Sequence, residues 1–184
     1  MKTEVLNMKQ DRNRQLVNER IEQLRKDKKI NRFWIIMISF WVIVLLFCWI
    51  LFGASRVQGN SMYPTFADGN IIIFQRVLNS YKTNDIVVYN RGDGQQYVKR
   101  IVAVEGDYVD IDDATGRLLV NGVPADEPYA NGETFRGERV RYPVLLKEGE
   151  YFCLGDNRRN SRDSRDYGVI EKDMISGKVR CRIW

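Results

Sequence analysis

The sequence contains no histidine among its 184 residues. A Ser-His-Asp triad, a Cys-His pair and a histidine-ligated zinc site are therefore excluded within a single chain. The three cysteines, Cys48, Cys153 and Cys181, form no Cys-x-x-Cys pair and are too few for a four-cysteine metal site. We expect Cys153 and Cys181 to be unpaired thiols in the core, and we expect neither a metal nor a cofactor.

The sequence also has no net charge outside its N-terminal tail. Residues 1–32 carry ten Lys or Arg and five Asp or Glu, whereas residues 33–184 carry 19 of each sign. A basic tail on a neutral body is not the charge distribution of a nucleic-acid-binding domain. We therefore expect no nucleic-acid partner.

A long apolar run follows the tail. Residues 33–52 include no charged side chain, and their one polar side chain is that of Ser39. Twenty helical residues reach about 30 Å, which is the hydrocarbon thickness of a bilayer. We predict a single transmembrane helix over residues 33–53, with Trp34 and Trp49 near its ends. A cleaved signal peptide is the alternative, but its apolar region is usually shorter, about 7–15 residues.

The basic residues predict the orientation of this helix. Five Lys or Arg lie between residues 25 and 32, whereas Arg56 is the single one among residues 54–73. The positive-inside rule then places residues 1–32 in the cytoplasm and residues 54–184 outside the membrane. The spacing of Val17, Ile21 and Leu24 predicts a short helix in the tail. Its basic face either binds anionic lipid or serves as a topology signal alone.

The part beyond the membrane helix is mainly β. Short runs rich in β-branched and aromatic residues alternate with turn residues, and no long helical period occurs. We predict an antiparallel β domain over residues 54–184, a hairpin over residues 109–120 and a small β cap inserted at about residues 108–145. In the last strand, Val179, Cys181 and Ile183 are expected to share the buried face.

Two residues in these runs could carry chemistry. Ser61 lies in the sequence GNSMYPT, where it is either a nucleophile or an ordinary turn serine. Lys99 lies in an apolar strand, where burial would lower its pKa from about 10.4 and make it a usable base. A lysine that reaches water from an edge strand is the alternative.

A polar stretch, GDNRRNSRDSRDYG, occupies residues 155–168. Asp156, Asn157 and Ser161 can hydrogen-bond to nearby backbone, and Asp163 and Arg165 can pair with other charges. By itself, the stretch is read by default as a surface loop whose polar groups are satisfied locally.

Four motifs in this order behind an N-terminal anchor resemble those of bacterial type I signal peptidases, in particular their short Gram-positive-like branch. They are SMYPT at residues 61–65, NDIVVY at 84–89, YVKRIVAVEGD at 97–107 and GDNRRNSRDSRDYG at 155–168. The resemblance implies a membrane-bound serine–lysine endopeptidase. It would remove signal peptides from exported preproteins at the outer face of the bacterial cytoplasmic membrane.

The resemblance also implies roles for single residues. Ser61 would attack the scissile carbonyl, and neutral Lys99 would take its proton. Ser161 would orient the Lys99 amine. The salt bridges that hold the loops would be formed by the supporting residues Asp156, Asp163, Arg100 and Arg165.

The oxyanion would be bound by the Ser61 N–H. Gly59 replaces the serine that supplies a second donor in many members, so any contribution there would come from backbone or water. Asn84 replaces a glycine that usually precedes the aspartate of the second motif.

The substrate implied by the resemblance is a preprotein with small residues at the cut site, of the Ala-x-Ala type. An extended peptide would add beside strands at the site by backbone pairing. The pocket walls would be formed by Val57, Gly59, Met62, Val88, Tyr97 and Val98. The lipid bilayer and, by proximity, the protein-export machinery would be further partners.

Three other functions fit parts of the sequence. An accessory factor for surface-fibre assembly would share the fold, but such proteins typically lose the serine or the lysine. A self-cleaving serine–lysine domain would need no membrane span and would carry a DNA-binding module. An unrelated binding module would not be expected to contain the four motifs.

Overall fold

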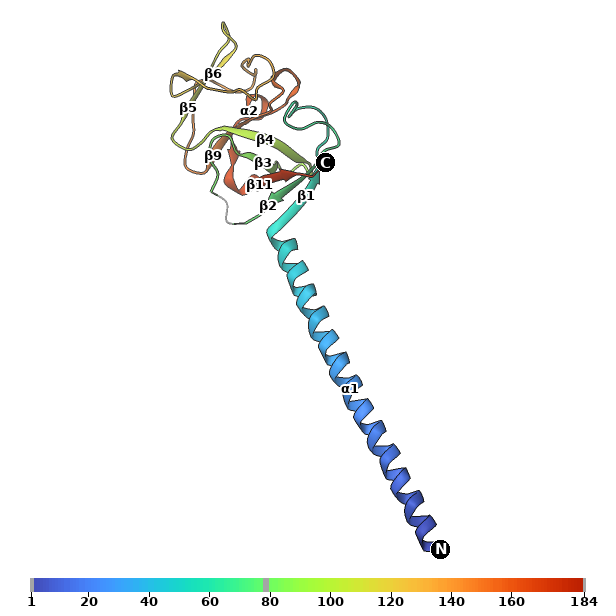
Figure 1. The fold of residues 1–184 in the computed structure, drawn as a ribbon. Helices are drawn as coiled ribbons and strands as arrows, with labels where there is room; N and C mark the ends of the chain where they lie inside the picture. The colour runs from blue at the N-terminus through green and yellow to red at the C-terminus, as the bar shows by residue number, and fades with distance from the viewer. Residues whose placement is uncertain (1, 78–79, 184) are drawn as a thin grey trace. The chain divides into compact units, whose positions relative to one another are not determined.

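A computed structural model describes residues 2–77 and 80–183, and the chain divides into two compact units between Cys48 and Trp49. In chain order the elements are α1 (Lys2–Leu51), β1 (Phe52–Arg56), β2 (Ile71–Gln75), β3 (Ile86–Asn90), β4 (Gln96–Ala103), β5 (Tyr108–Asp112), β6 (Arg117–Val120), β7 (Val123–Pro124), β8 (Val144–Leu145), β9 (Glu150–Leu154), η1 (Arg158–Asn160), α2 (Ser164–Tyr167), β10 (Ile170–Glu171), η2 (Lys172–Met174) and β11 (Ile175–Arg182). The chain is therefore an N-terminal helix followed by a mainly antiparallel β domain, as predicted (Figure 1).

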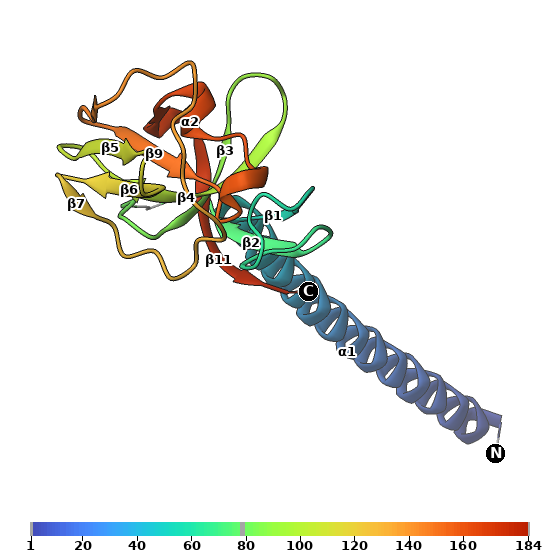
Figure 2. The ribbon, with the colours of Figure 1, turned by 90° about the horizontal axis from the view of Figure 1, so that it is seen from above.

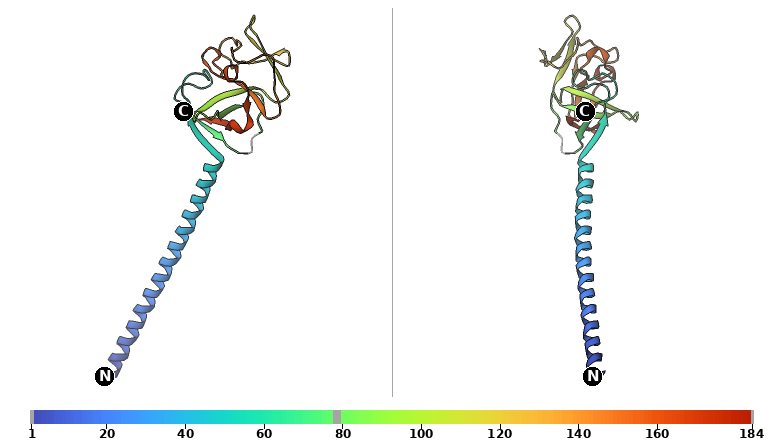
Figure 3. Two further views of the ribbon diagram at one scale, coloured as in Figure 1. Left: turned by 180° about the vertical axis from the view of Figure 1, so that it is seen from behind. Right: turned by 45° about the vertical axis from the view of Figure 1, so that its right-hand side comes forward.

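The helix α1 is continuous from the tail through the apolar run, as both views of Figure 3 show. Its part Leu16–Leu51 is long and apolar enough to cross a membrane, judged by length and composition. The expected short helix in the tail is thus the first part of one longer helix. The helix ends at Leu51, because Phe52 and Gly53, which were expected to close the span, pair with Gln75 and Phe74 in the sheet.

The larger sheet has seven strands in the order β1-β2-β11-β3-β4-β9-β10. Every strand pair in the described residues is antiparallel. The strand β4 lies near the middle of this order, between β3 and β9, and its residues from Val98 to Ala103 are buried. The centre of the sheet is where a polar side chain is most strongly desolvated.

A smaller sheet has the strand order β7-β6-β5-β8. The predicted hairpin is confirmed, because β5 and β6 pair in register from Val109 opposite Val120 to Asp112 opposite Arg117. Figure 2 shows β5, β6 and β7 gathered at one end of the β unit and β1 and β2 at the other. The smaller sheet packs on the larger one through a core that includes Ile111, Leu118 and Phe152.

The prediction for the last strand is wrong in part, because Cys181 and Ile183 are exposed. The register of β11 against β2 shifts between Val179 and Cys181, so that Val179 faces the buried Phe74 whereas Cys181 faces Ile73. Neighbouring residues of a strand point to opposite faces, and one extra residue therefore turns Cys181 away from the core. Cys153, by contrast, is fully buried, and both thiols are unpaired.

Candidate active site

Ser61 lies in a turn between β1 and β2. The next residue, Met62, is fully buried, and its carbonyl accepts a 2.9 Å hydrogen bond from the Phe66 N–H. On the other side the Ser61 carbonyl accepts a 3.0 Å bond from the Asn157 N–H. The turn is therefore fixed both by an apolar anchor and by the loop after β9, while the Ser61 side chain remains partly exposed.

Lys99 lies on β4, opposite Val87 of β3, and is only 4% exposed. Its Nζ lies 2.8 Å from Ser61 Oγ and 3.1 Å from the Val98 carbonyl oxygen. Burial lowers the pKa of Lys99 because the ammonium ion is poorly solvated there, although the nearby negative charge of Asp163 acts in the opposite direction. A lysine with a lowered pKa beside a serine hydroxyl can act as a general base.

A buried ion pair joins three segments around this serine–lysine contact. Arg100 Nε and one terminal nitrogen bind the two carboxylate oxygens of Asp156, at 2.9 and 2.7 Å. Asp156 is fully buried, and it also accepts a bond from the Thr65 hydroxyl. The pair thereby links the Ser61 turn, β4 and the loop after β9.

A second buried pair shapes the polar loop itself. Arg165 binds both oxygens of Asp163, at 2.8 and 2.9 Å, and Asp163 is also the N-cap of α2. One Asp163 oxygen accepts a 3.0 Å bond from the Gly155 N–H, and Arg165 donates to the carbonyl oxygens of Arg158 and Ser161. All four predicted supporting charges therefore lie in two ion pairs: Arg100–Asp156 joins distant segments, and Arg165–Asp163 braces the polar loop.

Ser161 does not make the contact that was predicted for it. Its Oγ is buried and has no hydrogen-bond partner among the described residues. Lys99 Nζ is instead held by Ser61 Oγ and the Val98 carbonyl. The Ser161 hydroxyl lies close to Gly155, where an added Cβ would come within 2.1 Å of it.

Replacing Gly155 with alanine is expected to destabilise the β unit. The new methyl group would lie 2.1 Å from Ser161 Oγ and 2.5 Å from the Ser61 carbonyl oxygen, so backbone would have to move. Overpacking of this kind costs about 1–3 kcal/mol. Thermal unfolding of the detergent-solubilised chain measures the effect, with Ser161→Ala as the control. That control removes a partnerless hydroxyl, and an equal loss in both variants would contradict the prediction.

The second predicted oxyanion donor is already engaged. The Gly59 N–H donates a 2.7 Å hydrogen bond to the Asp68 carboxylate, so this N–H is not free to bind an oxyanion at Ser61. Asp68 lies nine residues further along the same loop and closes it on Gly59. The Ser61 N–H, by contrast, makes no hydrogen bond within the part of the chain that the structure describes. A free backbone N–H beside a nucleophile is the usual oxyanion donor.

A cleft of about 710 Å³ opens at Ser61. It is bounded by residues 55–58 and 94–99, and we call it the strand cleft. Of the predicted pocket residues, Val57, Tyr97 and Val98 line it. Met62 and Val88 do not, because both are fully buried in the apolar cluster behind Val57 and Val98.

Both sides of the strand cleft have open backbone edges. The strand β1 is the last strand of its sheet and pairs with β2 alone. The strand β4 pairs with β3 from Gln96 to Arg100, but its pairing with β9 begins only at Arg100. The edge of residues 96–99 therefore has backbone groups available to an extended peptide.

Two residues that hold the site were not predicted from the sequence. Thr65 lies in the SMYPT motif, and its hydroxyl binds Asp156. Arg158 is buried and binds both oxygens of Glu127, at 3.0 and 2.6 Å, as well as the Thr134 hydroxyl. Both residues lie in the motifs quoted above. Their hydrogen-bond partners, however, lie 24 or more residues away along the chain, so the sequence did not indicate these contacts.

A mainly antiparallel β domain with a serine beside a buried lysine, at the end of a cleft with open strand edges, is the arrangement of a serine peptidase. The comparisons agree with this class and narrow it. The model of the family "Signal peptidase, peptidase S26" matches residues 30–184, so the chain belongs to the signal peptidase family. It is a type I signal peptidase, a serine enzyme whose family removes signal peptides.

Curated relatives show the same relationship. Signal peptidase IB of Staphylococcus aureus (strain COL) is 34% identical over 172 residues, covering 82% of this chain and 88% of the relative. Signal peptidase I S of Bacillus subtilis (strain 168) is 35% identical over 148 residues, covering 74% of this chain and 79% of the relative. A crystal structure of a signal peptidase I from Enterococcus faecalis V583 aligns with a TM-score of 0.48 at 26% identity, over 56% of this chain and all of that one.

Proposed function

We propose that Ser61 and Lys99 form the catalytic dyad of this peptidase and that it cleaves preproteins after Ala-x-Ala sites at the outer face of the cytoplasmic membrane. The observation that carries the proposal is the 2.8 Å contact between Ser61 Oγ and the Nζ of a lysine that is only 4% exposed. The sequence contains no histidine that could act as the base instead.

In this mechanism neutral Lys99 takes the proton of the Ser61 hydroxyl as Oγ attacks the scissile carbonyl carbon. The Ser61 N–H stabilises the oxyanion that develops. Lys99 then gives the proton to the leaving amine, and an acyl-enzyme ester remains on Ser61. A water molecule, deprotonated by Lys99, hydrolyses the ester and regenerates both residues.

The substrate would lie in the strand cleft as an extended strand, paired with the open edge at residues 96–99. Its small side chains would face the apolar wall formed by Val57 and Val98, with Tyr97 beside them. The wall is rigid because Met62 and Val88 pack behind it, so a larger side chain would meet core atoms. Alanine is the side chain that such a shallow wall accommodates.

The apolar helix would anchor the enzyme in the membrane, with residues 1–32 in the cytoplasm and residues 54–184 outside. The length and composition of Leu16–Leu51 and the basic residues before its apolar part support this topology. The lipid bilayer and, by proximity, the export machinery would then be partners.

Activity is expected to rise with pH as Lys99 loses its proton. Burial lowers the pKa of Lys99 from its ordinary value of 10.5, so the neutral amine forms at a lower pH than in a free lysine. Below the lowered pKa the base is protonated and kcat/KM falls tenfold per pH unit. Initial rates from about pH 6 to 10 measure this, and a flat profile would contradict a lysine base.

The proposal is tested by incubating the full chain, in detergent or liposomes, with a precursor that carries an Ala-x-Ala site. Mass spectrometry locates the cut. A single cut directly after the second alanine supports the proposal. If several such precursors remain intact over the whole pH range, the proposal fails, and an accessory role without peptidase activity would explain the fold.

A further inference from the structure

Two cavities meet at Ser61. The first is the strand cleft, and the second, of about 420 Å³, is bounded by residues 58–61 and 159–162. We call the second one the arginine cavity. Three residues border both cavities, namely Gln58, Ser61 and Arg162. A peptide with its scissile carbonyl at Ser61 in the strand cleft could therefore extend into the arginine cavity, with Arg162 at the junction of the two.

The charges that line these two cavities are all positive. Neither lining includes Asp or Glu, whereas Arg56, Lys99 and Arg162 border the strand cleft and Arg159 and Arg162 border the arginine cavity. Lys99 must be neutral to act as a base, so the permanent charges are those of the arginines. A cavity lined by charge of one sign attracts ligands of the opposite sign.

Arg162 is the arginine that borders both cavities, and its charge is not neutralised; Arg56, which borders the strand cleft alone, likewise has no ion pair in the described residues. Arg162 is exposed and forms no hydrogen bond or ion pair within the part of the chain that the structure describes. Arg159 has a carboxylate partner, Glu133, at 2.7 Å. A third cavity of about 440 Å³ is also bordered by Arg162, together with Glu138 and Asp166. Asp166 accepts the Asp163 N–H, and neither carboxylate pairs with Arg162 in the described residues.

We propose that Arg162 is a specificity-determining residue that favours Asp or Glu, and disfavours Lys or Arg, among the first residues after the cleaved bond. This rests on the proposed function, which places the small residues before the bond against the apolar wall of the strand cleft. The residues after the bond would then enter the arginine cavity, which Arg162 borders. A guanidinium binds a carboxylate through charge-assisted hydrogen bonds and repels another cation.

The test uses precursors that share one signal peptide and one Ala-x-Ala site. They differ in having Glu, Gln or Lys at one of the first three positions after the cut. At low salt the wild-type chain is expected to show a kcat/KM about fivefold higher for Glu than for Lys at the position nearest Arg162, the size expected of an exposed charge pair. Arg162→Gln is expected to bring this ratio close to one, and Arg162→Glu is expected to invert it. In the wild type the ratio should shrink as salt is added.

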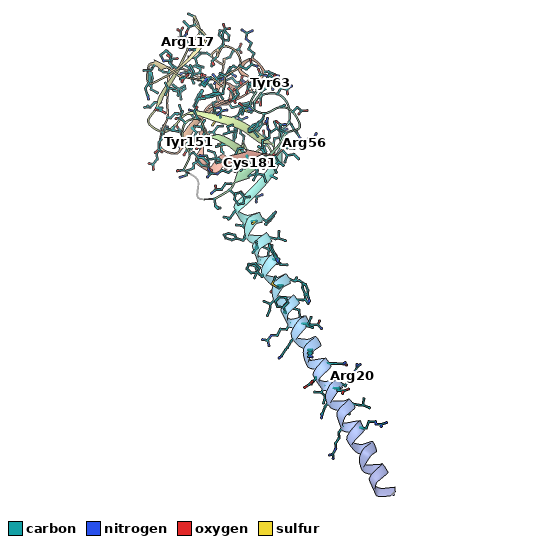
Figure 4. The ribbon with its side chains drawn as sticks, viewed as in Figure 1. Arg20, Arg56, Tyr63, Arg117, Tyr151 and Cys181 are labelled. Carbon is teal, nitrogen blue, oxygen red and sulfur yellow. The ribbon has the colours of Figure 1, made fainter. Side chains whose placement is uncertain are left out.

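The matched control is Arg117→Glu. Arg117 is an exposed arginine of β6, and Figure 4 shows it well separated from Arg56 of the strand cleft. This variant is expected to keep the wild-type ratio. The same Glu-to-Lys ratio in the wild type and both Arg162 variants would overturn the inference while the proposed function stood, because the precursors would still be cut. A wild-type chain that cuts none of the precursors would reject the proposed function and this inference with it.

Discussion

Replacement of Ser61 with alanine, or of Lys99 with methionine, is expected to lower kcat by roughly 10⁴-fold or more. Each change removes one member of the proposed dyad, whose hydroxyl and amine are 2.8 Å apart. The double variant is expected to be about as inactive as either single variant, because the loss of one partner already disables the other. Cleavage of an Ala-x-Ala precursor, followed over hours with purified protein, measures all three.

The free energy of unfolding distinguishes a variant that is inactive because its chemistry is lost from one that is inactive because it does not fold. Lys99 has a lowered pKa, so below that pKa the folded chain holds a buried ammonium ion at a cost. As pH rises from the lowered pKa towards 10.5, the unfolded state holds more protons than the folded state, and stability increases. Lys99→Met removes this cost and is expected to be more stable than the wild type at neutral pH, with a difference that shrinks at alkaline pH. An active Ser61→Ala or Lys99→Met variant would contradict the dyad.

Replacement of Asp163 with alanine is expected to destabilise the β unit by about 3–5 kcal/mol. Asp163 is fully buried, binds Arg165 through both oxygens and accepts the Gly155 N–H. Its removal leaves the Arg165 guanidinium buried without its carboxylate partner and also removes the N-cap of α2. Urea unfolding of the detergent-solubilised chain, followed by circular dichroism, measures the change in the free energy of unfolding.

Asp110→Ala is the matched control, because Asp110 forms a 2.7 Å pair with Arg136 in which both side chains are partly exposed. Such pairs contribute about 1 kcal/mol or less. The double variant Asp163→Leu/Arg165→Met, which removes both buried charges, is expected to recover part of the loss. Equal losses for Asp163→Ala and Asp110→Ala would contradict the importance of the buried pair.

The sequence alone could predict those features that depend on local pattern. The apolar run predicted the helix, and alternating β-branched residues predicted the strands. The motifs predicted which serine and lysine to examine, and the structure places the two in contact. The fold predictions succeeded because helix length and strand runs are set by neighbouring residues, whereas the catalytic role of the serine and lysine stays a prediction.

The features that the sequence could not predict depend on distant partners or on an irregular register. A β-bulge after Val179 exposes Cys181, and bulges have no reliable pattern in a single sequence. The Gly59 N–H is bound by Asp68, and the Ser161 hydroxyl faces Gly155, contacts that depend on how the loops close. A single sequence does not show such closures, because the same polar residues fit many loop conformations.

The partial pairing of β4 limits the length of peptide that could pair with its open edge. The open edge of β4, from residue 96 to 99, spans about 13 Å and can itself pair with only about four residues of a peptide. Backbone pairing does not depend on side-chain identity, so unrelated proteins can dock equally well if they present a short unfolded segment. Folded regions cannot enter, because their own strands and helices already use these backbone groups. The enzyme would thus distinguish its cut site by local unfolding as much as by sequence.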